Sequence, residues 1–274
     1  MLRIAPYTAV FTAQRSLNKS QMEMERAMKE LASGTRFVSP GADPAGYAIA
    51  ENIRAQLKGF SAARSNVENA TSFVQLAEAA LNEQNNILIR LRELAVQAAS
   101  DTFSETERGF LDEEFRGLVE EFDRIAKSTK YGSQSLLDGT TSNYEFQVGV
   151  HKGEDHVVRF ANNTDTRAAT LDIDGLSVSE KDDARDSLEA IDKALVRINA
   201  ARAKLGAVQS RMNVVVNHLD NELEAMTAAH SRAADADIAS AVSTVRRNQV
   251  LQAYQAQMLA EANAQNGTLI SMIS

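Results

Sequence analysis

The chain of 274 residues has no cysteine and no tryptophan, and its three prolines all lie within the first 44 positions. Without cysteine, disulfide bridges, thiolate nucleophiles and cysteine metal sites are excluded. Aromatic residues make up only 5% of the chain, so a core has to be built mainly from aliphatic side chains. An alanine-rich chain without proline after residue 44 favours long helices. The expected fold class is mainly α: an elongated coiled-coil-like rod of helices with a small β-hairpin region.

The sequence also lacks recognisable motifs for catalysis, nucleic-acid binding or membrane insertion. No Gly-rich phosphate loop and no Ser-His-Asp arrangement can be identified, so we expect neither an enzyme nor a cofactor. The formal net charge is −8, and the acidic excess lies in residues 65–225, which argues against nucleic acid as the main partner. No run of about 18 apolar residues is present, and the first residues do not resemble a cleaved signal peptide.

A heptad seam between residues 60 and 98 is the clearest positive pattern. Apolar residues recur there in alternating steps of three and four, with Gln84 as the one polar member. The seam predicts a helix from Gly46 to Ala99, roughly 80 Å long at about 1.5 Å per residue. Its members are Phe60, Ala63, Val67, Ala70, Val74, Ala77, Leu81, Gln84, Leu88, Leu91, Ala95 and Ala98.

A second helix is predicted after a break at residues 100–103. Ser104 and Glu107 have the Ser-x-x-Glu spacing of a capping box, and apolar residues from Leu111 to Ile125 again follow steps of four and three. We expect this helix to fold back along the first.

The helical period then gives way to alternation. Residues 144–150 alternate apolar and polar, and residues 156–160 form their expected partner in a β-hairpin. Residues 161–183 are polar and are interpreted as loops and strand fragments. Helical periodicity returns from Leu188 to Met226, which predicts a third long helix.

Both ends of the chain carry narrow apolar stripes, separated from the central helices by breaks at residues 33–46 and 229–237. A single helix of this kind cannot bury its stripe, so we expect the two terminal helices to pair with each other and with further copies. The predicted domains are a discontinuous inner domain of residues 1–44 plus 231–274, and a middle domain of residues 45–230 with the hairpin at about 140–183.

Several segments resemble bacterial flagellin, the filament subunit, over nearly the whole chain. The stretch between the second and third long helices is short, so the resemblance is to a minimal form without large variable outer domains. The segments that carry it are Gln14–Leu17, Leu31–Arg36, Asp43–Ile49, Arg64–Asn66, Leu91–Gln97, Phe146–Gly149, Arg202–Gln209, Ser231–Arg232 and Asp235–Asp237.

The resemblance implies a structural subunit that polymerises into the helical flagellar filament, the propeller for swimming. It implies export in an unfolded state through the flagellar type III apparatus to the cell exterior. The implied partners are further copies of the chain, an export chaperone at the C-terminal helices, and the filament cap and junction proteins. From the spacing of the terminal stripes we expect an inter-subunit axial seam of Leu17, Met24, Met28, Leu31, Leu251, Met258 and Leu269.

A receptor surface is also implied, because four residues match positions through which the flagellin-sensing Toll-like receptor of animals recognises the family. The alternative is that Leu94 faces a neighbouring subunit while the polar three form a solvated helix face. The four residues are Arg90, Leu94, Gln97 and Glu114.

The turn between the expected β-strands contains His151, Glu154, Asp155 and His156. All four are crowded into one loop without ligands from elsewhere in the chain, so a hydrophilic turn is favoured and no metal site is expected.

Two alternatives to the filament subunit remain at this point. The hook-to-filament junction protein shares the terminal-helix plan, although the contexts of Gln97, Gly206 and Ser231–Arg232 favour the filament subunit. A cytosolic coiled-coil scaffold would also show long heptads. Such a scaffold has no need of paired apolar terminal stripes separated by Pro-Gly breaks.

Overall fold

The computed structural model describes residues 6–140, 143–161 and 164–273, with the side chains of residues 6–9, 161 and 265–273 also left out of the description. The chain divides into two compact units, Met1–Leu57 with Ala225–Ser274, and Lys58–Glu224. Both boundaries lie inside long helices, α2 (Pro44–Ala98) and α4 (Lys181–Ala234), whereas the boundaries predicted from the sequence lie at the helix breaks. The first turns of α2 join the terminal unit because Tyr47 packs edge-on against Phe37, with 6.2 Å between ring centroids.

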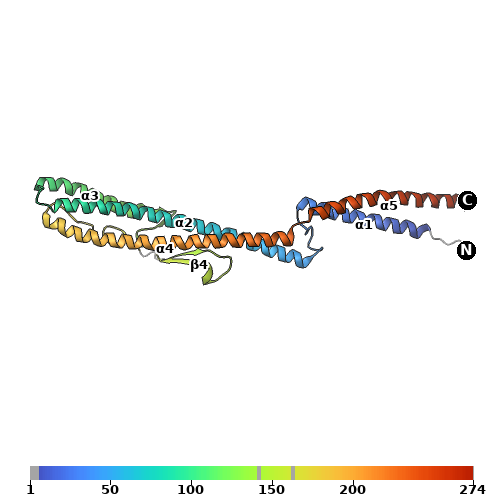
Figure 1. Ribbon diagram of the computed structural model, residues 1–274, viewed down its shortest axis with the longest axis horizontal. Coiled ribbons are helices and arrows are strands. Elements are labelled where there is room, and N and C mark those ends of the chain that lie inside the picture. The colour runs from blue at the N-terminus through green and yellow to red at the C-terminus, as the bar shows by residue number, and fades with distance from the viewer. Residues whose placement is uncertain (1–5, 141–142, 162–163, 274) are drawn as a thin grey trace. The chain divides into compact units, whose positions relative to one another are not determined.

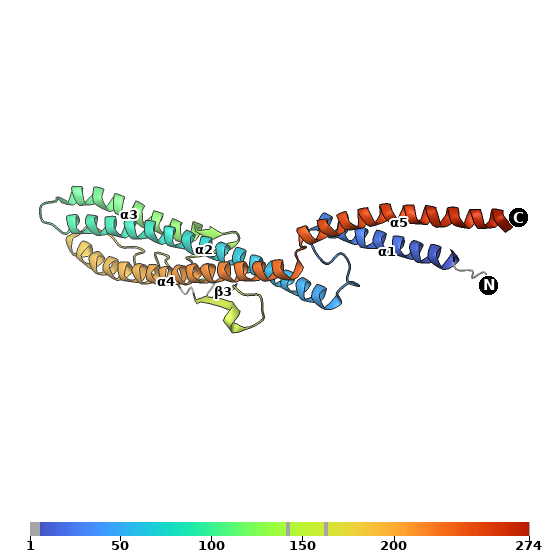
Figure 2. The ribbon, with the colours of Figure 1, turned by 45° about the vertical axis from the view of Figure 1, so that its right-hand side comes forward.

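The terminal unit is built on α1 (Pro6–Ser33) and α5 (Ile238–Ile273), which lie side by side and antiparallel (Figure 1). The same arrangement is visible from a second direction (Figure 2). The prediction that the terminal helices pair within one chain therefore agrees with the structure.

The larger unit packs parts of α2 and α4 lengthwise with α3 (Glu105–Ser128). Every position of the predicted seam from Ala63 to Ala98 is buried. Leu81, Leu88 and Leu91 of α2 belong to one core cluster that also contains the following residues of α3 and α4: Phe115, Phe122, Ile191, Ile198 and Leu205. The mainly helical fold class is confirmed.

The N-terminus of α3 has the predicted capping box. The Ser104 hydroxyl accepts a hydrogen bond from the Glu107 amide at 3.3 Å, and the Glu107 carboxylate accepts one from the Ser104 amide at 2.8 Å. The hydrogen bonds that the Ser104 amide and the Ser104 hydroxyl donate to the Glu107 carboxylate hold the pKa of Glu107 below its ordinary value. The box satisfies two amides that the first turn leaves free, and so defines where α3 begins.

The predicted β-hairpin is formed by β3 (Asn143–Gln147) and β4 (Val157–Ala161), paired antiparallel with Tyr144 opposite Phe160. A short 3₁₀ helix, η1 (Glu154–His156), precedes β4. Tyr144 and Phe160 are buried, and the Phe73 ring of α2 lies 4.6 Å from the Tyr144 ring. The alternating pattern thus predicted both the strands and the face that packs on the helices.

A second, much smaller hairpin is present that the sequence did not predict. It joins β1 (Lys130–Tyr131) to β2 (Gln134–Ser135) through Gly132, whose φ is +61°. Strands of two residues leave no periodicity to detect.

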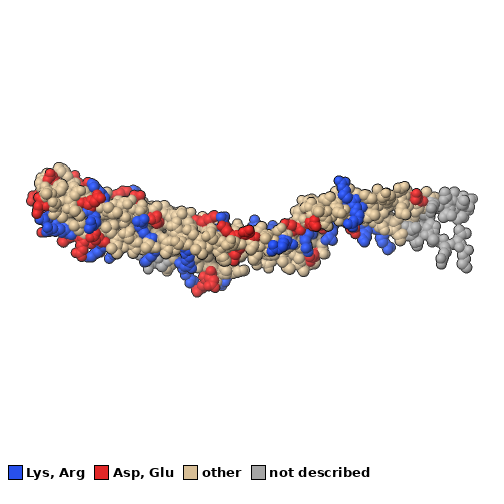
Figure 3. Space-filling model, in the orientation of Figure 1, with Lys and Arg blue, Asp and Glu red and all other residues tan. Residues whose placement is uncertain are grey.

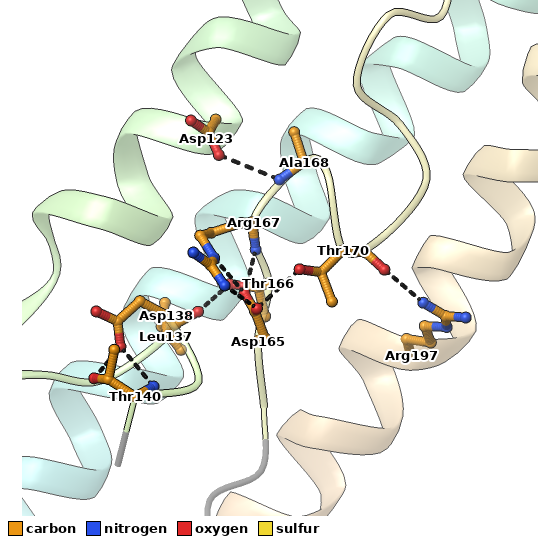
Figure 4. Close-up of polar contacts among 10 residues, drawn as sticks. All are labelled: Asp123, Leu137, Asp138, Thr140, Asp165, Thr166, Arg167, Ala168, Thr170 and Arg197. Carbon is orange, nitrogen blue, oxygen red and sulfur yellow. Dashed lines mark hydrogen bonds and ion pairs between the residues drawn. The ribbon is translucent and has the colours of Figure 1, made fainter. Parts of the chain in front are cut away.

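A polar network fastens the loop after β4 to its neighbours (Figure 4). The Asp165 carboxylate accepts hydrogen bonds from the Arg167 guanidinium at 2.5 and 2.9 Å and from the Thr170 hydroxyl at 2.8 Å. Asp123 of α3 accepts one from the Ala168 amide at 3.2 Å, and Arg197 of α4 donates to the Thr170 carbonyl at 2.8 Å. The stretch expected to hold strand fragments is instead held mainly by turns and side-chain hydrogen bonds, with one isolated bridge between residues 138 and 165.

Candidate assembly and recognition surfaces

The two helix breaks predicted near the chain ends meet each other. Thr35 and Asp235 form an isolated antiparallel bridge, in which the Arg36 amide donates to the Ala234 carbonyl and the Ala236 amide donates to the Gly34 carbonyl, both at 2.9 Å. Gly34 ends α1 with φ of +71°, a left-handed conformation that glycine adopts without steric cost. This joint connects the end of α1 to the start of α5.

The segment after the joint is stabilised around Asp43. Its carboxylate accepts a hydrogen bond from the Gly46 amide at 3.0 Å at the start of α2, and one from the Arg36 guanidinium at 3.1 Å. The Gly46 hydrogen bond, followed by the Arg36 interaction, holds the pKa of Asp43 below its ordinary value. The Arg36 guanidinium also lies over the Phe37 ring, 4.8 Å from its centroid. These contacts define the chain's path between α1 and α2.

The inward faces of α1 and α5 follow strict heptad spacing, in alternating steps of three and four. The side chains on these faces are buried or half-buried, while most of their neighbours are exposed. On α1 they are Val10, Ala13, Leu17, Ser20, Met24, Ala27 and Leu31, and on α5 they are Ala241, Val245, Asn248, Gln252, Gln255, Leu259 and Ala262.

The outward face of α5 is apolar and exposed. Val250, Leu251, Tyr254 and Met258 have exposed fractions of 56, 41, 65 and 65%, and their spacing places them on neighbouring turns of one face. Glu261 is the one charged residue in the sequence from 248 to 274. In the view of Figure 3, uncharged atoms make up most of the described part of the terminal pair, and a group of Lys and Arg side chains crosses it. Within this chain, nothing in the described residues covers that face.

The residues predicted as one axial seam lie on two surfaces. Leu17, Met24 and Leu31 belong to the inward heptad of α1, because that stripe is used to pair with α5. Met28 is 50% exposed, and Leu251 and Met258 lie on the outward face of α5. The side chain of the last predicted member, Leu269, lies outside the described residues.

The predicted receptor surface needs one correction. Leu94 is completely buried in the core cluster of the larger unit, so it faces neither a receptor nor a neighbouring subunit. Arg90, Gln97 and Glu114 are exposed, and the Arg90 guanidinium donates to the Glu114 carboxylate at 2.7 and 2.9 Å. Heptad spacing explains the error, because Leu94 lies one turn from the core residues Leu91 and Ala98.

The hairpin turn brings two histidines together, with 5.5 Å between the His151 and His156 rings. Across the described residues, no group of three or more His, Cys, Asp or Glu side chains is arranged to hold a metal ion. Likewise, none of the described helices has the length and apolarity needed to cross a bilayer.

The two terminal helices pair with each other and leave an apolar face of α5 exposed, and α2, α3 and α4 form the core of the larger unit. These features define the class: a helical structural protein with an apolar surface that no described part of the same chain covers. The family model for the bacterial flagellin N-terminal helical region matches residues 4–142, and that for the C-terminal helical region matches residues 188–273. The chain belongs to the bacterial flagellin family.

Individual relatives agree with the family assignment. A flagellin of Halalkalibacterium halodurans is 35% identical over 261 residues, covering 95% of this chain and 96% of that protein. Flagellin FlaB1 of Treponema pallidum is 36% identical over 276 residues, again covering 95 and 96%. The crystal structure of Bacillus cereus flagellin aligns with a TM-score of 0.51 at 28% identity, covering 57% of this chain and 88% of that one.

A flagellar hook-associated protein of Vibrio parahaemolyticus described as putative aligns with a TM-score of 0.59, covering 71% of this chain and all of that one. Its identity of 15% shows a shared fold only. The family match identifies the chain as a structural subunit of the bacterial flagellar filament and removes the reason to consider a cytosolic scaffold.

Proposed function

We propose that the chain polymerises through the outward face of α5, which packs against the terminal helices of further copies. The observation that carries the proposal is the uncovered apolar row of Val250, Leu251, Tyr254 and Met258. Fully burying a Val, Leu or Met side chain contributes about 1.5–3 kcal/mol, so covering the exposed parts of Val250, Leu251 and Met258, together with Tyr254, favours association. A contact between different surfaces of identical subunits generates a helical filament when the rotation between successive subunits does not close a ring.

The test replaces Leu251 and Met258 together with Asp. Charges on this face should prevent burial, so the variant is expected outside the cell as a subunit that does not pellet as filaments. Gln249→Asp is the control, because Gln249 is an exposed polar residue of the same helix on a different face from this row. Sedimentation and negative-stain microscopy of sheared material provide the readout. Normal filaments from the double variant would contradict the proposal.

The polymer is proposed to act as the swimming propeller, after export of the unfolded subunit through the flagellar type III apparatus. A chain without cysteine cannot be trapped by disulfides during passage, which supports this route. Fusing a tightly folded domain to the C-terminus should stop export, whereas a fused domain that unfolds readily should be tolerated. Export of both fusions in equal amounts would contradict passage in an unfolded state.

The further partners are an export chaperone at the C-terminal helices, and the cap and junction proteins of the filament. The exposed face of α5 supports a chaperone there, because such a face needs cover before assembly. The Leu251→Asp and Met258→Asp chain should show weaker chaperone capture from the producing cell, with export reduced but not abolished, while the Gln249→Asp control retains full capture. Equal capture of the double variant and the control would mean that the chaperone does not bind the exposed face of α5.

Recognition by an animal Toll-like receptor is proposed for the exposed Arg90, Gln97 and Glu114. The ion pair between Arg90 and Glu114 holds α2 and α3 side chains in one arrangement on the surface. Monomeric protein should activate a receptor reporter, and Arg90→Ala should weaken the response more than Arg116→Ala, which alters an exposed arginine of α3. The absence of any response at saturating dose would contradict the proposal.

A further inference from the structure

The outward face of α5 carries a sulfur atom that small oxidants can reach. Met258 is 65% exposed, and Tyr254, one helical turn away on the same face, is equally exposed. The chain has eight methionines and no cysteine, so methionine thioethers hold all of its sulfur. Mild peroxide, which oxidises sulfur side chains, therefore acts on this chain through methionine.

A second methionine has the same exposure in a different setting. Met22 of α1 is also 65% exposed. Among the residues three and four positions from Met258, Glu261 is the one with a charge, whereas three charged and exposed residues hold the corresponding positions around Met22. Those three are Lys19, Glu25 and Arg26. Met22 thus belongs to a solvated helix face, and Met258 belongs to the apolar row proposed to be buried in the polymer.

The larger unit supplies an internal reference for the same chemistry. Met212 of α4 is completely buried in the core cluster that α2 and the β3–β4 hairpin also form. Oxidation follows access to the sulfur, so Met212 should react only when the chain unfolds. Met22, Met212 and Met258 can therefore report separately on a solvated surface, the core and the proposed contact face.

Oxidation changes what the position of Met258 can bury. The thioether sulfur attacks one oxygen of hydrogen peroxide, so that a sulfur–oxygen bond forms and the oxygen–oxygen bond breaks. Sulfur loses two electrons, and the departing hydroxide takes up a proton from the transferred oxygen and leaves as water. The product is a sulfoxide, whose polar oxygen is costly to bury without a hydrogen-bond donor.

We propose that oxidation of Met258 to the sulfoxide keeps the free subunit out of the polymer, and that the polymer shields Met258 from oxidation. This inference rests on the proposed polymerisation through the outward face of α5. Methionine sulfoxide reductases reverse the modification, so the site acts as a redox switch on assembly.

The first part of the test maps oxidation in both states of the full chain. Free subunit and pelleted polymer receive the same low dose of hydrogen peroxide, and peptide mass spectrometry measures the sulfoxide at each methionine. In the free subunit, Met22 and Met258 should react at similar rates, and Met212 about tenfold or more slowly. In the polymer, Met258 should react about tenfold or more slowly than in the free subunit.

The second part measures polymerisation by sedimentation, starting from filament fragments as seeds. Peroxide treatment should raise the concentration of subunit that fails to pellet by about tenfold, as expected when a polar group is left unpaired in a contact. A sulfoxide reductase with a thiol reductant should restore pelleting. Circular dichroism and unoxidised Met212 verify that the treated chain remains folded.

Two pairs of variants assign the effect to one residue. Met258→Leu keeps the face apolar and should pellet after peroxide treatment, whereas Met22→Leu, the matched control, should remain as sensitive as the parent. Met258→Gln places a polar side chain of similar length there and should pellet poorly without any peroxide. Met22→Gln should pellet as the parent does.

Three results would overturn the proposal: peroxide sensitivity of Met258→Leu equal to that of the parent, normal pelleting of Met258→Gln, or undiminished oxidation of Met258 in the polymer. Normal filaments from the Leu251→Asp and Met258→Asp chain would instead contradict the proposed polymerisation face. If that double variant fails to polymerise but the parent pellets normally with Met258 oxidised, the oxidation proposal alone is contradicted.

Discussion

Arg202 of α4 donates two hydrogen bonds to one carboxylate oxygen of Glu78 on α2, from Nε at 3.3 Å and from Nη2 at 2.9 Å. The two side chains retain 29 and 37% exposure, so the pair is partly shielded from water. It links two helices whose residues are far apart in the sequence, and it lies within the larger unit.

Replacing Arg202 with Ala should therefore reduce the free energy of unfolding by about 1 kcal/mol, through lost hydrogen bonds and lost packing of the aliphatic stem. Arg92→Ala is the control, because its pair with Asp192 also joins α2 to α4 but is about half exposed on both sides. That variant should lose well under 1 kcal/mol. Denaturant unfolding followed by circular dichroism measures the free energy of unfolding of both variants. Equal losses of stability in the two variants would contradict the idea that partial shielding from water strengthens the Arg202–Glu78 pair.

Two glycines should respond in opposite directions to alanine. Gly117 lies in the interior of α3, and no neighbouring atom of the described residues lies within 4 Å of the position that an added Cβ would take, so Gly117→Ala should stabilise by about 1 kcal/mol. Gly139 has φ of +70°, and an added Cβ would lie 2.9 Å from Asp165 Cβ. Gly139→Ala should destabilise by about 1–2 kcal/mol because both strain and a clash arise. In thermal unfolding, the melting temperature of Gly117→Ala should lie above that of the parent, and the melting temperature of Gly139→Ala should lie below it.

The Asp165 network should make stability depend on acid pH. Hydrogen bonds from Arg167 hold the pKa of Asp165 below its ordinary value. Stability from this carboxylate is present above its unfolded pKa, near 4, and is lost as pH falls through the lower folded pKa. Asp165→Asn should lower the melting temperature by a few degrees at pH 7, and the difference from the parent should shrink toward pH 3. A difference that stays constant over this range would exclude the carboxylate's charge as the cause.

The capping box makes a local prediction for α3. Ser104→Ala removes the hydroxyl that accepts from the Glu107 amide, and should cost about 1 kcal/mol of unfolding free energy. Ser104→Asp should retain most of the stability because its carboxylate can accept the same hydrogen bond. Hydrogen exchange should quicken in the first turn of α3 for the alanine variant alone, and equal exchange in both variants would argue against the cap.

The helices were predictable from the sequence because the apolar periodicity repeats over several heptads and the capping box is a chemically specific motif. The seam from Ala63 to Ala98 offered several heptads, and the box at Ser104 marks the start of α3. The hairpin followed from alternation in which Tyr144 and Phe160 share the buried face. Periodicity of this kind records which side of an element is buried, and so it predicted the core well.

The surfaces were harder to predict, because a stripe shows that a residue is covered without showing what covers it. Leu17 and Leu251 both belong to apolar stripes, yet Leu17 faces α5 and Leu251 faces outward. Leu94 matches a family position implied in receptor recognition, but in this chain its side chain is buried in the core. The polar contacts of Asp165 join residues whose spacing carries no periodic signal.

The order of the helices along the chain also bears on folding during synthesis. Helix α1 is made well before α5, so the inward heptad of α1 has no partner until α5 follows. A chain that stopped before α5 would keep the residues of the joint but would lack both the partner of that heptad and the outward apolar face. The pairing of the terminal helices therefore depends on synthesis of α5, and subunits truncated before α5 would be unable to compete for places in the proposed polymer.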